Sequence, residues 1–243
     1  MKGVILAGGK ATRLRPLTWV TNKHLLPIYD KPMIYYVLES MQRAGIKEVL
    51  ITSSPDHCGH LINLLRSGKD FNLKLSYAIQ EEAGGIPQAI MLARDFAAGG
   101  KILVILGDNI FKHNLSQAVK DFEKQEKGAK VFAKRMPVES KQYGVIEVDE
   151  KGIVQSIEEK PEHPKSDLAQ TGIYMYDNRA YSFIQKLQPS KRGELEVTDL
   201  NNCYLKEGTM TCEVMKEWWV DAGTSFNELL RASNLVAQEL NKE

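Results

Sequence analysis

The amino-terminal segment constrains the fold of this 243-residue chain more than any other part of its sequence. Residues 4–7 form a continuous apolar run that stops at Gly8 and Gly9. A strand with apolar side chains on both faces is typical of a parallel sheet that helices cover on both sides. We therefore expect this segment to be a buried parallel strand whose carboxyl end opens into a glycine-rich turn.

The rest of the chain alternates strand-like and helical segments up to residue 125 and changes pattern after it. In the first part we expect strands at residues 49–51, 73–79 and 102–106, and helices at 32–44, 60–66 and 87–96. In the second part we expect strands at 130–134, 144–148, 153–158, 171–176 and 211–214, and helices at 178–186, 197–207 and 225–240.

Strands that alternate with helices imply right-handed crossovers and helices on both faces of a sheet, whereas short connections indicate an antiparallel or mixed portion. The pattern predicts a doubly wound, Rossmann-like α/β fold with a mixed sheet, in a single compact domain. We divide it into residues 1–125, a smaller portion at 126–224 and a C-terminal helix at 225–243.

Composition excludes several classes of protein. Hydrophobic residues make up 43% and charged residues 26% of the chain, as in ordinary globular proteins. The 32 Lys and Arg residues nearly cancel the 31 Asp and Glu residues, so no basic field attracts nucleic acid. No apolar run approaches the roughly 20 residues that span a bilayer, and no signal-peptide pattern is present. We therefore expect a cytoplasmic protein without nucleic-acid or membrane partners, and its sequence is compatible with a homo-oligomer.

The loop at residues 6–14 is the first candidate binding element. Glycines allow close approach of a phosphate, and successive free N–H groups bind anions. The loop matches neither the dinucleotide fingerprint nor a Walker A sequence, and a double glycine alone indicates a tight turn equally well. Arg13 and Lys23 favour phosphate binding, because a triphosphate needs fixed cations as well as amides.

Two aspartates are candidate metal ligands. Asp108 follows an apolar strand at the edge where open α/β sheets bind their ligands, and Asp221 also follows an apolar stretch. Magnesium usually takes one or two carboxylates together with substrate phosphates. Taken alone, each aspartate is equally consistent with a turn or a helix cap.

A set of motifs in the same order along nearly the whole chain gives a more specific indication. They are LAGGxxTRL at residues 6–14, NKHLLP at 22–27, DKPMIYY at 30–36, LGDN at 106–109, YGV at 143–145, EEKP at 158–161, RGELEVTD at 192–199 and WVDAGT at 219–224. In this combination the chain resembles the glucose-1-phosphate thymidylyltransferases of the sugar nucleotidyltransferase family. The resemblance implies that residues 1–125 bind the nucleotide and residues 126–224 the sugar phosphate.

The resemblance also implies a role for individual residues. The nucleotide would be bound by Gly8, Gly9, Thr12, Gln80 and Gly85, with the last two at the base. The sugar phosphate would be bound by Tyr143, Gly144, Glu159, Gln170 and Trp219. The catalytic cations would be Arg13, Lys23 and Lys160, and the Mg²⁺ ligands would be Asp108 and Asp221.

The implied reaction joins dTTP and α-D-glucose 1-phosphate to give dTDP-glucose and pyrophosphate, with Mg²⁺ as cofactor. A sugar phosphate is largely dianionic at neutral pH, so it attacks the α-phosphorus without a general base. UTP is an alternative substrate, because uracil lacks only one methyl group, which is worth about 1 kcal/mol. A catalytically silent nucleotide-sugar sensor or assembly subunit with the same fold is an alternative of another class.

Three features depart from the family pattern. Ala11 replaces a glycine, which we expect to be tolerated only with a negative φ. His24 stands where thymidylyltransferases commonly have glutamine, so contacts beside Lys23 are expected to differ. The chain ends soon after the expected last helix, where long thymidylyltransferases have a segment that forms tetramer contacts and a regulatory nucleotide site. We therefore expect the short form, without that regulation.

Overall fold

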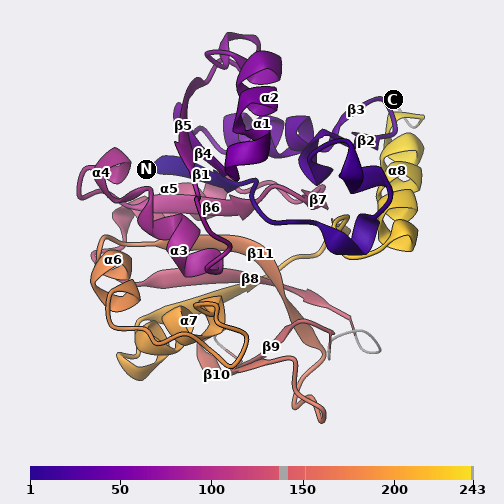
Figure 1. Ribbon diagram of the computed structural model, residues 1–243. Helices are drawn as coiled ribbons and strands as arrows, with labels where there is room; N and C mark the ends of the chain where they lie inside the picture. The colour runs from indigo at the N-terminus through magenta and orange to yellow at the C-terminus, as the bar shows by residue number, and fades with distance from the viewer. Residues whose placement is uncertain (137–141, 151, 242–243) are drawn as a thin grey trace.

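The computed structural model describes residues 1–136, 142–150 and 152–241, and a mixed β-sheet forms its centre (Figure 1). In order across the sheet lie β10 (Val154–Glu159), β9 (Gly144–Val148), β11 (Leu168–Tyr176), β6 (Ile102–Leu106), β1 (Lys2–Leu6), β4 (Glu48–Ser53) and β5 (Lys74–Ile79). Beside this path, β8 (Ala129–Arg135) pairs with β11, and β12 (Met210–Val214) pairs with β8. The predicted doubly wound α/β fold with a mixed sheet is confirmed.

One half of the sheet is parallel. β1 pairs in parallel with β4 and β6, and β5 continues this half beside β4. The connections contain α1 (Met33–Arg43), α2 (Pro55–Leu65), α3 (Ile86–Met91) and α4 (Arg94–Ala97). Two predicted boundaries are wrong. The helix expected at 60–66 begins at Pro55, a residue well suited to a first turn, and the helix expected at 87–96 is two short helices.

Helices cover both faces of the sheet, which explains the continuous apolar run of β1. One face carries α1, α2 and α5 (Ser116–Lys124), and the other carries α3, α6 (Arg179–Ile184) and α7 (Val197–Lys206). Figure 1 shows α1 and α2 above the sheet and α6 and α7 below it. Ile5 belongs to the first core and its neighbour Val4 to the second, and both are fully buried. Successive side chains on a strand point to opposite faces, so both must be apolar here.

The other half of the sheet is largely antiparallel. β11 is antiparallel to both β6 and β8, and β9 is antiparallel to β10. β12 returns in parallel with β8. All the strands predicted after residue 125 are present, within a few residues of their expected limits.

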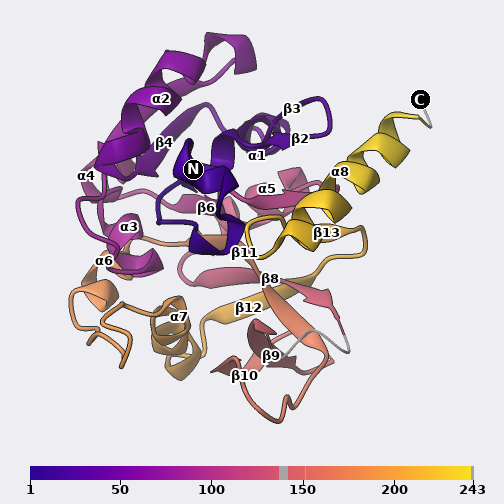
Figure 2. The same cartoon turned by 45° about the vertical axis from the view of Figure 1, so that its right-hand side comes forward.

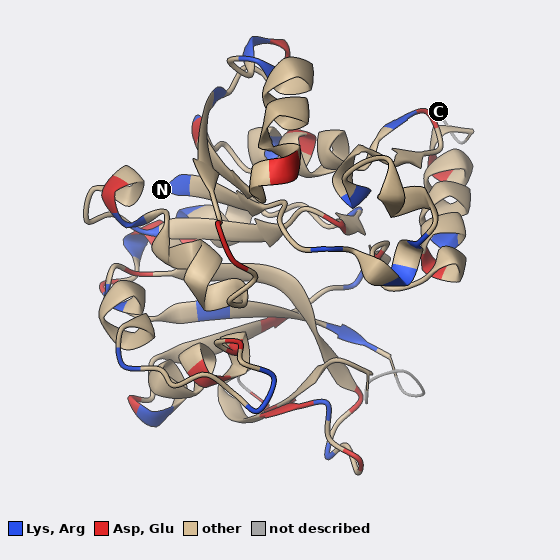
Figure 3. Cartoon of the chain, in the orientation of Figure 1, with Lys and Arg blue, Asp and Glu red and all other residues tan. Residues whose placement is uncertain are grey.

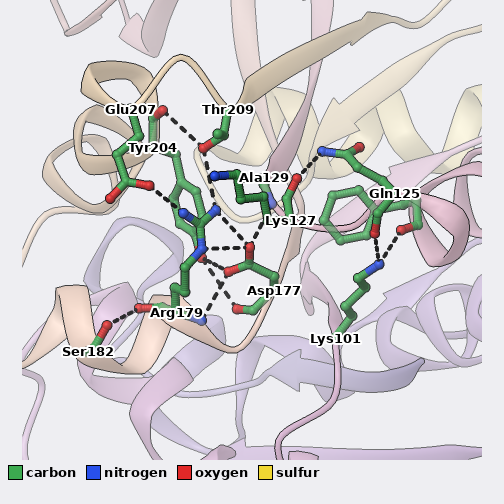
Figure 4. A network of polar contacts seen from close by, with 12 residues as sticks. Lys101, Gln125, Lys127, Ala129, Asp177, Arg179, Ser182, Tyr204, Glu207 and Thr209 are labelled. Atoms are coloured by element: carbon green, nitrogen blue, oxygen red, sulfur yellow. Dashed lines mark hydrogen bonds and ion pairs between the residues drawn. The ribbon is translucent and has the colours of Figure 1, made fainter.

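A buried ion-pair network holds the end of β11 to its neighbours (Figure 4). The carboxylate of Asp177 accepts hydrogen bonds from the Gly128 N–H (2.6 Å) and the Tyr204 hydroxyl (2.9 Å). It also lies 2.8 Å from a guanidinium nitrogen of Arg179. Since a buried carboxylate is stable only when it is paired and hydrogen-bonded, this network fixes α6 and α7 to the sheet.

Several short elements were not predicted from the sequence. They are the strand pairs β7 (Asn109–Phe111) with β13 (Trp219–Asp221) and β2 (Pro27–Ile28) with β3 (Lys31–Pro32), the helix α5, and the 3₁₀ turns η1 (Thr12–Leu14), η2 (Leu17–Trp19), η3 (Lys23–Leu25) and η4 (Lys69–Phe71). A strand of two or three residues is too short to show an alternating pattern. The pairing of β7 with β13 nevertheless places Asn109 opposite Asp221.

The last helix, α8 (Phe226–Leu240), lies beside β13 at the margin of the molecule (Figure 2). Ser225 caps it, as predicted, by accepting a hydrogen bond from the Glu228 N–H (3.1 Å). Ala232 and Val236 pack in a small apolar cluster with Val220 of β13. The helix therefore supports the strand that ends at Asp221.

Charges of both signs are interspersed over the chain in the view of Figure 3, in line with the balanced composition. Within the described ranges, no helix combines the length and the apolar character needed to cross a bilayer.

A histidine links the segments that precede β13. The Nε2 of His113 lies 2.9 Å from Glu213 and its Nδ1 lies 3.0 Å from Glu217. Lys130 also faces Glu213, at 3.3 Å. The hydrogen bond that His113 donates to Glu213 is the main cause that raises the pKa of His113, although partial burial opposes it. The imidazole thus joins the loop after β7 to the end of β12.

We predict that His113→Gln destabilises the protein more at pH 6 than at pH 9. The pKa of His113 is higher in the folded state than in the unfolded state, where it is about 6.5. The charged imidazole therefore stabilises the folded protein fully below that value, and this contribution is lost as pH rises through the folded-state pKa. Urea unfolding of both proteins at the two pH values measures this difference. His163→Gln, at an exposed position, is the control. An equal loss of unfolding free energy at both pH values would contradict the role of the charged imidazole.

Candidate active site

Two adjoining cavities open at the carboxyl ends of the parallel strands. The first has a volume of about 380 Å³ and contains most of the residues predicted to bind the nucleotide. The second has a volume of about 160 Å³ and contains all the residues predicted to bind the sugar phosphate. Arg13 and Asp221 line both cavities. The place where the two cavities meet is therefore the natural position for a reaction between two ligands.

Nearly all the predicted site residues lie together. The first cavity is lined by Gly8, Gly9, Arg13, Lys23, Gln80, Gly85, Asp108 and Asp221. The second is lined by Arg13, Tyr143, Gly144, Glu159, Lys160, Gln170, Trp219 and Asp221. Thr12 is exposed on the same loop as Arg13 and lines neither cavity, so its contact with a nucleotide stays a prediction.

The glycine-rich loop adopts an unusual backbone at two residues. Gly9 has a φ of +94°, and Ala11 has φ 46° and ψ 41°. Our expectation of a negative φ at Ala11 is therefore wrong. The left-handed α region is narrow but allowed for an L residue, at a cost of about 1 kcal/mol. The turn is held by the Thr18 hydroxyl, which donates to the Ala11 carbonyl (2.8 Å).

Asp108 and Asp221 come from distant parts of the chain to the same cavity. Asp108 follows β6, and Asp221 ends β13, opposite Asn109. The Nζ of Lys23 lies 2.5 Å from Asp108 Oδ2. Asp221 accepts a hydrogen bond from the Gly223 N–H (3.1 Å).

The two carboxyl groups have opposite pKa shifts. Burial alone would raise the pKa of Asp108, but the adjacent Lys23 ammonium lowers it below its usual range. Burial and then repulsion by Asp108 raise the pKa of Asp221. Burial would lower the pKa of Lys23, but Asp108 and Asp221 together raise it, so this lysine is charged. A divalent cation between the carboxylates would remove their repulsion, and two carboxylates with ligand phosphates suit Mg²⁺.

His24 also lines the first cavity and is only 1% exposed. Burial and the nearby Lys23 lower its pKa to about 3, so the ring is neutral. Its Nδ1 lies 2.5 Å from Asn22 Oδ1, and a Cβ on Gly107 would lie 2.6 Å from its ring. His24 therefore supports the end of β6 by packing and adds no charge to the site.

The expected base-binding residues form one edge of the first cavity. Gly85 has a φ of +96°, and a Cβ at this position would lie 2.1 Å from the Leu195 carbonyl oxygen. Only glycine fits here, for both conformational and steric reasons. Ile86 lines both cavities beside Gly85.

The second cavity has an aromatic wall and a charged floor. The rings of Tyr143 and Trp219 meet edge to face with centroids 5.4 Å apart. Glu159 accepts a hydrogen bond from the Thr198 hydroxyl (2.8 Å), and the Lys160 Nζ lies 3.7 Å from Glu159.

Gln170 is buried and lines the second cavity. Its side-chain carbonyl accepts from Asn201 (3.2 Å), and its amide donates to the Tyr174 hydroxyl (3.4 Å). The side chain is thus held by β11 and α7, and its atoms form part of the cavity wall.

Two residues that we did not place in the site organise it. Asn109 Oδ1 accepts hydrogen bonds from Trp219 Nε1 (2.7 Å) and from the Gly172 N–H (2.8 Å). Its amide nitrogen lies 3.2 Å from Asp108 Oδ1. Gly223 leaves no room for a side chain, since a Cβ there would lie 2.1 Å from Asp108 Oδ2. Both positions lie within the quoted motifs, but their contacts become visible only in three dimensions.

Comparisons with known proteins identify the family of this chain. Residues 2–239 match the Nucleotidyl transferase family model. Glucose-1-phosphate thymidylyltransferase of Neisseria gonorrhoeae is 44% identical over 92% of this chain and 78% of its own length. The enzyme of that name from Xanthomonas campestris pv. campestris (strain B100) is 43% identical over 97% of this chain and 80% of its own length.

Solved structures of similar proteins have the same fold. A Bacillus anthracis protein assigned as a glucose-1-phosphate thymidylyltransferase, crystallised with sucrose, superposes with a TM-score of 0.91. It is 44% identical, and the match covers 97% of this chain and 94% of that chain. A UDP-glucose pyrophosphorylase in complex with UDP-glucose has a TM-score of 0.87 at 26% identity, with 98% of both chains covered.

We predict that Gly223→Ala weakens the binding of a divalent cation at least tenfold, a loss typical of displaced metal-site groups. The new methyl group would push the Asp108 carboxylate from its position. Titration with Mn²⁺, followed by electron paramagnetic resonance, measures the affinity. Gly59→Ala is the matched control, because a Cβ there meets no atom within 4 Å. Unchanged Mn²⁺ affinity in Gly223→Ala would exclude Asp108 from the cation site.

Proposed function

This chain belongs to the nucleotidyl transferase family, and we propose that it joins dTTP and glucose 1-phosphate at the junction of its two cavities. The products are dTDP-glucose and pyrophosphate. The relatives from Neisseria and Xanthomonas are named for this reaction and match most of the chain. The observation that carries the proposal is the convergence of Arg13, Lys23, Asp108 and Asp221 on one cavity.

In this proposal Asp108 and Asp221 hold Mg²⁺ beside the triphosphate. The bound ion would neutralise phosphate oxygens and so assist the departure of pyrophosphate. Arg13 and Lys23 contribute fixed positive charge at the first cavity, where charge accumulates on the leaving group. Because these groups are already in place, they stabilise the transition state without reorganisation at the moment of reaction.

Lys160, Glu159 and the aromatic wall serve the second substrate. Lys160 offers an ammonium group for the phosphate of glucose 1-phosphate, and Glu159 offers a carboxylate for sugar hydroxyls. A hydrogen bond from Thr198 orients Glu159. The sugar phosphate is mostly dianionic at neutral pH, with a second pKa of about 6, and it needs no general base. Catalysis then consists of in-line alignment and charge neutralisation.

We propose that different portions of the chain bind the two substrates. Residues 1–125 bind the nucleotide, residues 126–224 bind the sugar phosphate, and the C-terminal segment that begins at residue 225 contributes the helix α8 (Phe226–Leu240). Asp221 is the link between the parts, because it belongs to the second and lines both cavities.

UTP is the second candidate nucleotide. Uracil and thymine present the same O4 and N3–H edge, and the similar pyrophosphorylase structure contains a uridine nucleotide. A methyl-sized difference is worth about 1 kcal/mol, or about fivefold in specificity. The ratio of the turnover rates with dTTP and UTP therefore decides which nucleotide is the preferred substrate.

We predict pyrophosphate release with dTTP and glucose 1-phosphate that exceeds the release with every other pair of substrates. The assay crosses dTTP, UTP, dCTP and dATP with the 1-phosphates of glucose, galactose, mannose and N-acetylglucosamine. Mass spectrometry identifies the nucleotide sugar that forms. Removal of divalent cations with a chelator should abolish turnover, and added Mg²⁺ should restore it.

Two results would change the proposal. Turnover with none of these pairs would favour a catalytically silent sensor of the same fold. Faster turnover with UTP than with dTTP would make the chain a uridylyltransferase.

A further inference from the structure

A second glutamine fixes the orientation of Gln80 at the base-binding edge. Gln88 lies on α3, and its Oε1 accepts a hydrogen bond from the Gly84 N–H (2.9 Å). The same oxygen accepts from Gln80 Nε2 (2.7 Å). Gln80 Nε2 also approaches the Gly85 carbonyl oxygen, at 3.4 Å. Gln88 thus contacts Gln80 and the residue that precedes Gly85.

The polarity of this network follows from the backbone. A backbone N–H can only donate, so the Gln88 atom that faces Gly84 must be the oxygen. Since this oxygen also faces the Gln80 amide, the Gln80 atom in contact with it must be the nitrogen. The two ends of a glutamine amide are otherwise nearly indistinguishable, and their hydrogen-bond partners assign them.

The remaining end of the Gln80 amide is therefore an acceptor on the cavity side. Gln80 Oε1 lies 3.0 Å from the position that a Cβ on Gly8 would occupy, and both residues line the first cavity. Gly85 lines the same cavity, and its backbone N–H is a donor. An acceptor beside a donor complements the N3–H and O4 edge of thymine or uracil.

Cytosine presents the opposite pattern on that edge. Its N3 is an acceptor and its N4 amino group is a donor. The N3 lone pair would therefore face the Gln80 oxygen, and the N4 amino group would face the Gly85 N–H. A site built to accept a hydrogen bond disfavours a ligand that lacks the donor, because the buried partner is left unpaired.

We propose that Gln88 is the positioning residue that holds the Gln80 carbonyl oxygen toward the base and so selects bases with a protonated N3. The inference rests on the proposed function only in assigning this cavity to a nucleotide. Gln88 acts through Gln80 and touches no reacting atom. Without it, the Gln80 amide can turn and offer its nitrogen to the base, which removes the preference.

Equilibrium binding tests this role without any need for turnover. Calorimetry measures the affinities for dTTP and dCTP, each with Mg²⁺, for the unmodified protein, Gln88→Leu, Gln88→Glu and Gln117→Leu. Gln117 lies on α5, outside both cavities, and its side chain hydrogen-bonds Asp121, so it controls for a glutamine-to-leucine change. Thermal melting shows that each variant is folded.

The unmodified protein should prefer dTTP by at least about tenfold, and Gln88→Leu should lose most of that preference through weaker dTTP binding. Gln88→Glu should keep it, because a carboxylate accepts the same hydrogen bonds from Gly84 and Gln80. Gln117→Leu should match the unmodified protein. An unchanged ratio in Gln88→Leu, an equal loss in Gln88→Glu, or no preference in the unmodified protein would overturn the inference.

These outcomes are separate from those of the turnover assay. A protein that prefers dTTP but forms no nucleotide sugar would retain the role of Gln88 and lose the proposed reaction. A protein that forms dTDP-glucose, with the same base preference in Gln88→Leu, would retain the reaction and lose the role of Gln88.

Discussion

The mutual repulsion of the buried Asp108 carboxylate and the partly buried Asp221 carboxylate is the constraint on which the site depends. Asp108 pairs with Lys23, while Asp221 lies in the same cavity and has a raised pKa. Burial of a charge without full compensation costs several kcal/mol, and about 3–5 kcal/mol is typical when a buried pair loses a partner. The chain maintains this arrangement with β7, β13 and α8, elements that add little to the main sheet. A divalent cation is the simplest group that would compensate it.

The topology of the sheet explains why the two cavities adjoin. The chain runs outward from β1 through β4 to β5 and then returns to β6 on the other side of β1, so the strand order reverses between β1 and the strand that precedes Asp108. Open α/β sheets bind ligands in the crevice at such a point. The glycine-rich loop approaches it from β1, and Trp219 and Asp221 approach it from β13. The fold thereby places the two cavities side by side at this crevice.

The sequence predicted the main strands and helices, because their apolar runs are long enough to show a period. Most of the cavity residues were predicted from the motifs shared with the family. It did not predict β7 and β13, which are too short for a pattern. The positive φ of Ala11 was also not predicted, because alanine residues rarely adopt it and the sequence gives no local sign of it. Asn109 and Gln88 act through amide contacts. Such contacts depend on side-chain geometry in three dimensions, which spacing along a chain cannot give.

The position of a bound cation tests the central claim most directly. Crystals grown with dTTP and Mn²⁺ in place of Mg²⁺, measured at the manganese absorption edge, locate the ion by its anomalous scattering. The account predicts a single strong peak within coordination distance of both the Asp108 and the Asp221 carboxylates. A peak held by the phosphates alone, or one that lies away from both aspartates, would contradict it.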